Sequence, residues 1–386
     1  MGAEREDRTA GTATVLFALG AAWTIGNVGG SVAPLSAEFD LSLATIGVLS
    51  GSLLLGFSLP GTLLAPTIGE RFGIVRTMTF AAVLCAVGNL VFAVSPDLAV
   101  LVIGRALSGF ALGLAIVHGP VFAGATGGVV RVALFGAAIQ LGIAGGLGLG
   151  AILDDAGIDW RYTFLLSAVV AVSAVPLLLS QDEISYERSG GTGFIKPAIR
   201  SPRVWRLGAL FISIFSVPLI LGSWLVHYLA VDNGLAAATA GLLSFIMFGV
   251  SAAAREYGGR LAKRGFSPAL LAGGAPFLAA IGLAILALDD SPGFALVAVI
   301  AAGVGFAIPY GMAIVQAQRL YPSEPTEPVA LVSLLGSSIP VLLVPLIGSL
   351  LDDGHGSEVF LALAAVVAAS GALNLRPVTG SLEPRP

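Results

Sequence analysis

Two ionisable side chains lie deep inside long apolar runs of the sequence, and they are the first candidates for chemistry. Arg105 lies about 12 Å into its run at 1.5 Å per helical residue, and His118 follows further along the same run. A guanidinium in hydrocarbon needs an anion or a polar partner, and an imidazole exchanges a proton near neutral pH. The two side chains point about 220° apart around a helix, so they cannot share a partner unless the helix is kinked.

Neutral polar and aromatic residues in similar runs complete the candidate site. Trp23 and Asn27 lie one helical turn apart, so they share a helix face. Such side chains stack against a small solute and hydrogen-bond to it, and they also join neighbouring helices. Both roles stay open for each of them. The predicted substrate-binding residues are Trp23, Asn27, Arg105, His118, Gln140, Tyr310 and Gln316.

Several other kinds of chemistry are excluded by the composition. The single cysteine, Cys85, permits neither a disulfide framework nor a cysteine-based metal site. The three histidines stand at 118, 227 and 355, too scattered for a lipid-modifying enzyme. Asp352, Asp353 and His355 could bind a cation loosely, but we prefer a solvated acidic loop. We therefore predict no catalytic residue, no metal and no cofactor.

The net charge and the motifs exclude further classes of protein. The chain carries 19 Lys+Arg and 23 Asp+Glu, a net charge of −4 that does not favour binding to nucleic acid. It contains no phosphate-binding loop of the form G-x-x-x-x-G-K-[ST], so we expect no ATP site. The first apolar run is longer than the core of a signal peptide, and the N-terminus lacks a myristoylation pattern.

The helices that must position the candidate residues follow from hydropathy. Of the 386 residues, 56% are hydrophobic and 11% are charged, which excludes a water-soluble fold. A bilayer-spanning helix needs about 20 apolar residues. The sequence predicts twelve such spans, at 12–33, 44–66, 77–95, 98–123, 132–152, 162–180, 205–229, 236–254, 268–288, 294–316, 329–351 and 358–375.

A polar, Ser-, Gly- and Pro-containing stretch at 181–204 separates two sets of six spans and suits an exposed linker. We therefore predict an all-α membrane protein of two pseudo-symmetric six-helix bundles, at 1–180 and 205–386.

The distribution of charge predicts the orientation, because Lys and Arg near the ends of spans are retained in the cytoplasm. With the N-terminus inside, 17 of the 19 basic residues lie on the inner side, and Arg161 is the single basic residue in the outer loops. Those loops carry twelve acids. The acidic outer face reflects either this bias alone or a salt-rich habitat. We expect a multi-pass protein of the plasma membrane with cytoplasmic N- and C-termini.

Two short internal matches favour a repeat of the six-span unit. Basic, glycine-containing turns follow spans 2 and 8, and they align Arg71 with Arg264. In spans 4 and 10, GLAIVHG at 113–119 aligns with GFAIPYG at 305–311, which pairs His118 with Tyr310.

Three motifs stand out within the six-plus-six layout: GERFGIVR at 69–76, GRALSGFALG at 104–113 and DWRYTF at 159–164. In these features the chain resembles the major facilitator superfamily over essentially its whole length. In the first of these, Glu70 replaces the usual Asp and Pro66 the leading Gly, and two bases are missing. Span 5 also lacks the Gly-Pro pair typical of members that exchange a proton outward, which weakens a drug/proton antiporter interpretation.

The resemblance implies a fold in which spans 1, 4, 7 and 10 line a central cavity, and it favours a structural role for Arg105 near Trp23 and Asn27. The charged turns suggest a cytoplasmic gate. Its predicted residues are Glu70, Arg71, Arg76, Arg260 and Arg264.

We therefore expect a secondary transporter that moves a small solute by alternating access between the bundles. The absence of Asp and Glu near the middle of any predicted span favours a neutral or anionic organic solute. Alternatives are efflux of lipophilic compounds and a non-transporting membrane sensor of the same fold. The expected partners are the solute, membrane lipid and a coupling ion, proton or sodium, if there is one. The expected state is a monomer, and no nucleic-acid partner is expected.

Overall fold

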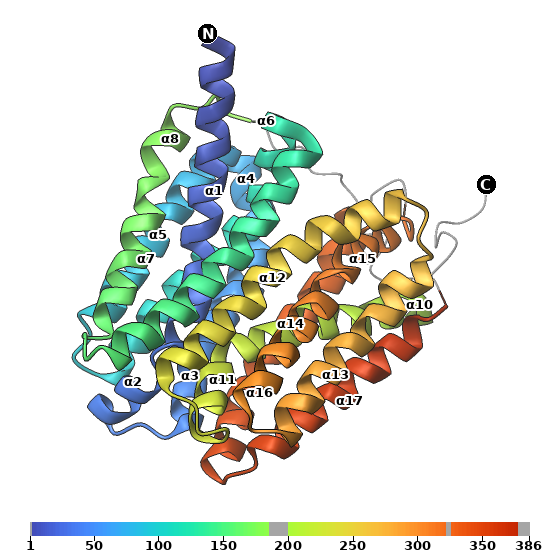
Figure 1. Ribbon diagram of the computed structural model, residues 1–386. Coiled ribbons are helices and arrows are strands. Elements are labelled where there is room, and N and C mark those ends of the chain that lie inside the picture. The colour runs from blue at the N-terminus through green and yellow to red at the C-terminus, as the bar shows by residue number, and fades with distance from the viewer. Residues whose placement is uncertain (1, 185–199, 322–325, 377–386) are drawn as a thin grey trace. The chain divides into compact units, whose positions relative to one another are not determined.

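The computed structural model describes residues 2–184, 200–321 and 326–376, and the described residues are helical with no strand. Figure 1 shows the arrangement of these helices. Twelve helices are long and apolar enough to cross a membrane, as the hydropathy predicts. They are Arg8–Gly29, Leu43–Phe72, Ile74–Ala93, Leu98–Gly128, Val130–Asp155, Arg161–Leu179, Pro202–Val231, Ala237–Leu261, Leu270–Leu288, Pro292–Gln318, Leu331–Asp352 and Gly356–Asn374.

The elements of the first six spans are separated by short turns. A left-handed Asp40 ends α2, and Gly73, at φ +85°, is the whole connection between α4 and α5. Two residues with non-helical backbone, Gly127 and Gly128, break the long α6 into two spans. The bounds are α1 Gly2–Gly29, α2 Val32–Phe39, α3 Leu43–Gly56, the π-helical turn η1 Phe57–Gly61, α4 Thr62–Phe72, α5 Ile74–Ala93, α6 Leu98–Asp155, α7 Arg161–Ser173 and α8 Val175–Leu179.

The elements of the last six spans are interrupted at two further π-helical turns and at a proline. Pro309 begins a new helix directly after α14. The bounds are α10 Pro202–Phe211, η2 Ile212–Ser216, α11 Val217–Val231, α12 Ala237–Lys263, η3 Leu270–Gly274, α13 Ala275–Leu288, α14 Pro292–Ala307, α15 Pro309–Gln318, α16 Thr326–Asp352 and α17 Gly356–Asn374.

Two predicted boundaries are wrong. Helix α4 continues to Phe72, so Glu70 and Arg71 stand in its last turn instead of in a loop. Helix α12 continues to Lys263, so Arg255 and Arg260 lie on the helix that was predicted to end at residue 254. In both cases charged residues continue a helix beyond its apolar stretch, because backbone hydrogen bonding does not require apolar side chains.

Contacts divide the chain into two compact units. The first comprises Met1–Arg188, Leu221–Ala252 and Val341–His355, and the second comprises Ser189–Ile220, Ala253–Pro340 and Gly356–Pro386. The first unit therefore includes most of α11 and the end of α16, beyond the predicted 1–180 bundle. That residues 1–180 and 205–386 move as two bodies against each other stays a prediction. Most of the linker 181–204, at 185–199, lies outside the described residues.

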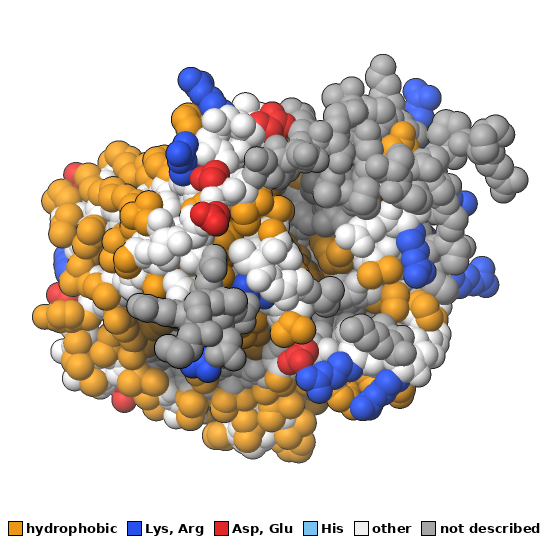
Figure 2. Space-filling model, turned by 90° about the horizontal axis from the view of Figure 1, so that it is seen from above, with side chains coloured by type: hydrophobic (Ala, Val, Ile, Leu, Met, Phe, Trp, Pro, Cys, Tyr) orange, Lys and Arg blue, Asp and Glu red, His pale blue; other side chains and the backbone are white. Residues whose placement is uncertain are grey.

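Small residues set the helix packing in the first unit, and a buried apolar cluster lies in the second. In the first, a Cβ on Gly146 of α6 would lie 2.6 Å from the carbonyl oxygen of Trp23 on α1, so the two helix backbones touch. In the second, buried residues from Val204 to Val332 form an apolar cluster against which Tyr310 packs. Figure 2, which views the end at which α1 begins, shows several Lys and Arg side chains among apolar ones.

Candidate functional site

A buried polar network surrounds Arg105 in the first unit. Its Nη1 donates to the Thr24 carbonyl oxygen at 2.6 Å and lies 3.2 Å from the Thr24 hydroxyl. The guanidinium carbon lies 5.9 Å from the centre of the Phe92 ring, and the residue is 1% exposed. Arg105 therefore joins α6 to α1 and α5, the packing role that the resemblance implied.

Asn27 belongs to the same network. Its Nδ2 donates to Asn89 Oδ1 at 3.3 Å, and its Oδ1 accepts from the Thr163 hydroxyl at 3.1 Å. The Thr24 hydroxyl also donates to Asn89 Oδ1, at 3.4 Å. The network thus ties α1 to α5 and α7. Sequence reasoning did not select Thr24, Asn89 or Thr163; the available signal was their polarity within apolar spans.

His118 lies elsewhere on α6, against α4. Its Nδ1 is 3.0 Å from the Leu114 carbonyl oxygen, and its ring fills the space that a side chain at Gly69 would occupy. The residue is fully buried. His118 therefore contacts α4 while Arg105 contacts α1, in agreement with the predicted angle between them.

Trp23 and Gln140 are the remaining candidates in the first unit. The Trp23 ring packs beside Gly145, and its Nε1 is buried without a hydrogen-bond acceptor among the described residues. Gln140 on α6 is 4% exposed. A buried indole N–H usually has an acceptor, so Trp23 is a donor that a polar solute could satisfy.

The candidate residues of the second unit are Tyr310 and Gln316, and Arg255 lies beside Tyr310. The Arg255 guanidinium carbon lies 4.2 Å from the centre of the Tyr310 ring, and its Nε is buried without a hydrogen-bond partner among the described residues. Tyr310 lies next to the break between α14 and α15, and Gln316 is 3% exposed. Arg255 was missed because it was assigned to a loop, although an Arg directly after an apolar run was visible.

The predicted gate residues have local partners. Arg76 lies 3.8 Å from the Glu183 carboxylate, which also accepts from the backbone N–H groups of Val75 and Arg76 at the start of α5. The Arg71 guanidinium lies over the Phe72 ring at 5.3 Å. Glu70 is exposed in the last turn of α4.

In the second unit, Arg260 pairs with Glu256 on its own helix at 2.5 Å, and Arg264 follows the end of α12. Each of the four arginines thus lies within one turn of a helix end. Whether the five residues act together as a gate stays a prediction.

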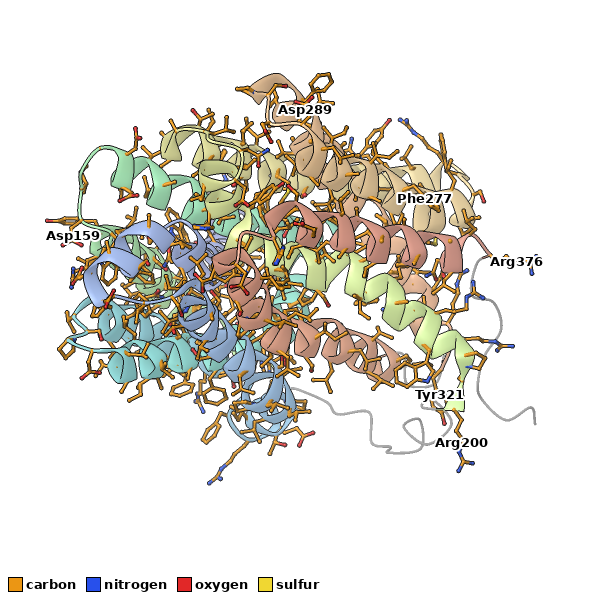
Figure 3. All side chains as sticks on the ribbon, turned by 90° about the horizontal axis from the view of Figure 1, so that it is seen from below. Asp159, Arg200, Phe277, Asp289, Tyr321 and Arg376 are labelled. Carbon is orange, nitrogen blue, oxygen red and sulfur yellow. The ribbon has the colours of Figure 1, made fainter. Side chains whose placement is uncertain are left out.

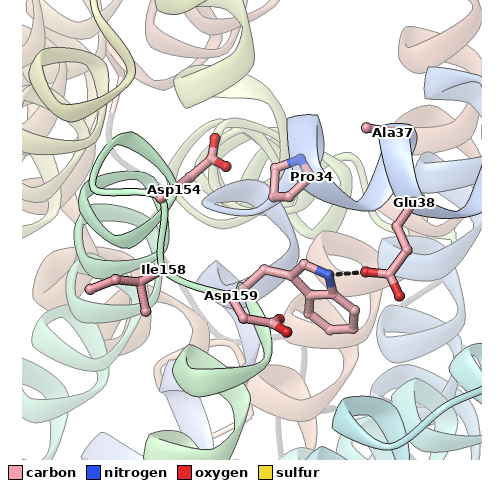
Figure 4. A pocket seen from close by; sticks show the side chains of 8 residues that line it. Pro34, Ala37, Glu38, Asp154, Ile158 and Asp159 are labelled. Atoms are coloured by element: carbon pink, nitrogen blue, oxygen red, sulfur yellow. Dashed lines mark hydrogen bonds between the residues drawn. The ribbon is translucent and has the colours of Figure 1, made fainter.

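The opposite end of the first unit carries a pocket of about 500 Å³. Trp160 Nε1 donates to the Glu38 carboxylate at 2.8 Å on one side of it. Asp154 and Asp159 also line the pocket, as Figure 4 shows. Arg161 binds the Glu38 carboxylate, and this hydrogen bond lowers the pKa of that carboxyl. Figure 3 labels Asp159 in this α6–α7 turn and Asp289 in the α13–α14 turn.

The acidic loop at Asp352, Asp353 and His355 does not direct the Asp352 carboxylate toward a shared cation. The Asp352 carboxylate accepts hydrogen bonds from the backbone N–H groups of Leu43 and Ala44, so its oxygens face a helix start. Within the described parts of the chain, no three His, Cys, Asp or Glu side chains are grouped as metal ligands.

The twelve apolar helices of the described residues define a multi-pass membrane protein. The sequence profile of the Major Facilitator Superfamily matches residues 12–342, and the chain belongs to this family. Membership places it among transporters and not among enzymes.

Two plant relatives are similar over part of the chain. A D-xylose-proton symporter-like protein 2 of Arabidopsis thaliana is 34% identical over 140 residues, 35% of this chain and 27% of the relative. A chloroplastic D-xylose-proton symporter-like protein 3 of the same plant is 35% identical over 137 residues, 34% of this chain and 24% of the relative. The matches thus span about a quarter of these relatives' length.

Solved structures share the fold over nearly the whole chain. A D-xylose-proton symporter superposes with a TM-score of 0.76 at 17% identity, covering 97% of this chain and 98% of that one. The nucleoside transporter NupG gives a TM-score of 0.71 at 13% identity, covering 95% and 98%. At these identities the likeness establishes the fold.

Proposed function

We propose that this protein is a secondary transporter that carries a small, neutral, polar organic solute across the plasma membrane by alternating access of residues 1–180 against 205–386. The proposed solute-contacting residues are Trp23 and Gln140 in the first unit and Tyr310 and Gln316 in the second. One observation carries the proposal: Trp23 presents a buried indole N–H that no described residue satisfies. A hydroxyl-rich solute such as a sugar or polyol would supply the acceptor.

The charges inside the spans support a neutral solute. No Asp or Glu is buried among the described residues, which disfavours a cation. The arginines that lie deep in the spans or are buried there already have interactions: Arg105 donates to Thr24, Arg255 contacts the Tyr310 ring, and Arg131 donates to the Thr126 carbonyl oxygen. These interactions disfavour an anion. The plant relatives are named for D-xylose and protons, so a pentose is the first solute to test and a proton the first coupling ion.

The orientation and assembly are part of the same proposal. The distribution of Arg and Lys along the sequence supports cytoplasmic termini. We propose that the protein works as a monomer, because each unit has its own packed interior.

A ligand-induced thermal shift on the purified protein tests the solute class. The panel comprises pentoses, hexoses, polyols, organic anions and lipophilic cations. The informative variant is Trp23→Phe, which keeps an aromatic ring and removes the indole N–H. The matched control is Trp205→Phe, at a residue that is 54% exposed. We expect a sugar or polyol to stabilise the native protein and the control but not Trp23→Phe.

Other outcomes would replace the proposal. Stabilisation by organic anions that disappears in Arg105→Ala would indicate an anion carrier. Stabilisation by lipophilic compounds that survives this change would indicate efflux. A protein that no solute stabilises, and that exchanges none in proteoliposomes, would fit a sensor. Uptake that is unchanged when the proton and sodium gradients are collapsed would indicate an uncoupled facilitator.

A further inference from the structure

The start of α3 is completed by a residue more than three hundred positions away. The first N–H groups of a helix have no partner within it. In α3, the Ser42 hydroxyl accepts from Thr45 N at 3.2 Å, and the Ser42 carbonyl accepts the first regular helical bond, from Ile46 N at 3.0 Å. The free N–H groups of Leu43 and Ala44 donate to the Asp352 carboxylate at 3.0 and 3.1 Å.

The helices below this contact touch through their backbones. A Cβ on Gly47 of α3 would lie 2.6 Å from Cα of Pro345, and one on Gly51 would lie 3.0 Å from the Val341 carbonyl oxygen. A side chain at Gly348 would collide with the carbonyl group of Leu43. The absence of side chains lets α3 and α16 approach closely over about two helical turns.

A third helix joins the same contact. Trp224 of α11 is 1% exposed, and its Nε1 donates to the Val344 carbonyl oxygen of α16 at 3.0 Å. All three segments belong to the first compact unit. Yet α3 lies in the predicted 1–180 bundle, whereas α11 and α16 lie in the predicted 205–386 bundle.

The contact stands at the end of the spans predicted to face outward. If the two bundles move against each other, α3 must separate from α16 there whenever the site opens outward. The glycine contacts are packing contacts, which are lost as soon as the two helices move apart. The Asp352 contact places a negative charge on the positive end of α3 and uses both carboxylate oxygens, an arrangement that stabilises the joined state.

We propose that Asp352 is a gating residue: its carboxylate is a releasable latch that holds α3 and α16 together and sets how often the outer side opens. The inference rests on the proposed alternating-access function. Asp353 provides the comparison. It is the next residue and also an exposed acid, and among the described residues its side chain forms no hydrogen bond or ion pair.

Cysteine labelling measures the opening directly. The reporter is Ser50→Cys, in a Cys85→Ala background, since Ser50 is 3% exposed and lies on α3 between Gly47 and Gly51. A membrane-impermeant maleimide is added to intact cells, and the labelling rate is compared for Asp352→Asn and Asp353→Asn. We expect Asp352→Asn to react on the order of fivefold faster, the effect of losing one charge at a helix terminus, and Asp353→Asn to react at the native rate.

A second reporter separates opening from unfolding. Ser167→Cys probes α7, where Ser167 is fully buried away from α3 and α16. It should stay unreactive in Asp352→Asn. If it reacts, the smaller Asp352→Ser variant takes the place of Asp352→Asn. Two results in a folded Asp352 variant would overturn the latch. One is a labelling rate at Ser50→Cys equal to the native rate, and the other is an equal increase of that rate in Asp353→Asn.

The labelling assay does not depend on transport. Faster labelling of Ser50 in a protein that moves no solute would refute the proposed function and keep the latch. Labelling that occurs only when reagent is applied to inside-out vesicles would overturn the outward position of the latch.

Discussion

Replacing Gly146 by Ala tests the close packing of α1 against α6. The new Cβ would lie 2.6 Å from the Trp23 carbonyl oxygen and 2.9 Å from the Asn27 nitrogen. All these neighbours are backbone atoms, so no side chain can rotate away. To restore ordinary contact the helices must separate by about 0.8 Å, and overpacking of this kind costs ~1–3 kcal/mol.

Gly136→Ala is the matched control on the same helix. A Cβ there has no neighbour within 4 Å, and replacing a helical glycine by alanine gains up to ~1 kcal/mol. Both variants gain this helix propensity, so their unfolding free energies should differ by the overpacking cost, ~1–3 kcal/mol. In detergent, the apparent melting temperature of Gly146→Ala should fall by several degrees, while that of Gly136→Ala stays level or rises.

The same shift of α1 would move Trp23, so Gly146→Ala should also weaken stabilisation by the solute that the thermal-shift panel identifies. Equal melting temperatures for the two alanine variants would refute the reasoning, because they would show that α1 and α6 are not in backbone contact.

Three further predictions concern charged side chains. Arg105→Lys cannot reproduce the planar contact with Thr24 and Phe92, so we expect a loss of ~1.5–3 kcal/mol of stability, read as a lower melting temperature; an unchanged value would show that Arg105 does not join the helices. Tyr310→Leu removes the ring under Arg255 and should cost ~1 kcal/mol, whereas Tyr257→Leu, at an exposed ring on α12, should cost less; equal losses would contradict this. Arg161 lowers the pKa of Glu38 below its ordinary 4.5, so the stabilisation is present above that pH and is lost as the pH falls through the lowered pKa. Glu38→Gln should therefore flatten the acid limb of the stability profile, by less than ~1 kcal/mol because the pair is largely solvated, and an unaltered profile would exclude the pair as its source.

The sequence predicted the number of spans and the family. Twelve apolar runs of bilayer length, the position of the linker and the three motifs are local properties of the chain, and a helix in a bilayer satisfies its backbone hydrogen bonds without help from distant residues. The sequence likewise showed that no Asp or Glu lies near the middle of a predicted span, from which the preference for a neutral or anionic solute followed. The helix ends were predicted less accurately, because Arg71 and Arg255 continue helices beyond the end of their apolar pattern.

The tertiary structure decided which side chains meet. Hydropathy gives the depth of Arg105 and His118 but not the helices opposite them; the structure places Thr24 against one and Gly69 against the other. The pairing of Arg255 with Tyr310 likewise depends on two spans far apart in the sequence. Asp352 looked like an acid in a solvated loop, and its role depends on the start of a helix more than three hundred residues earlier. Such contacts depend on how helices are rotated and packed, and a single sequence carries no local signal for that.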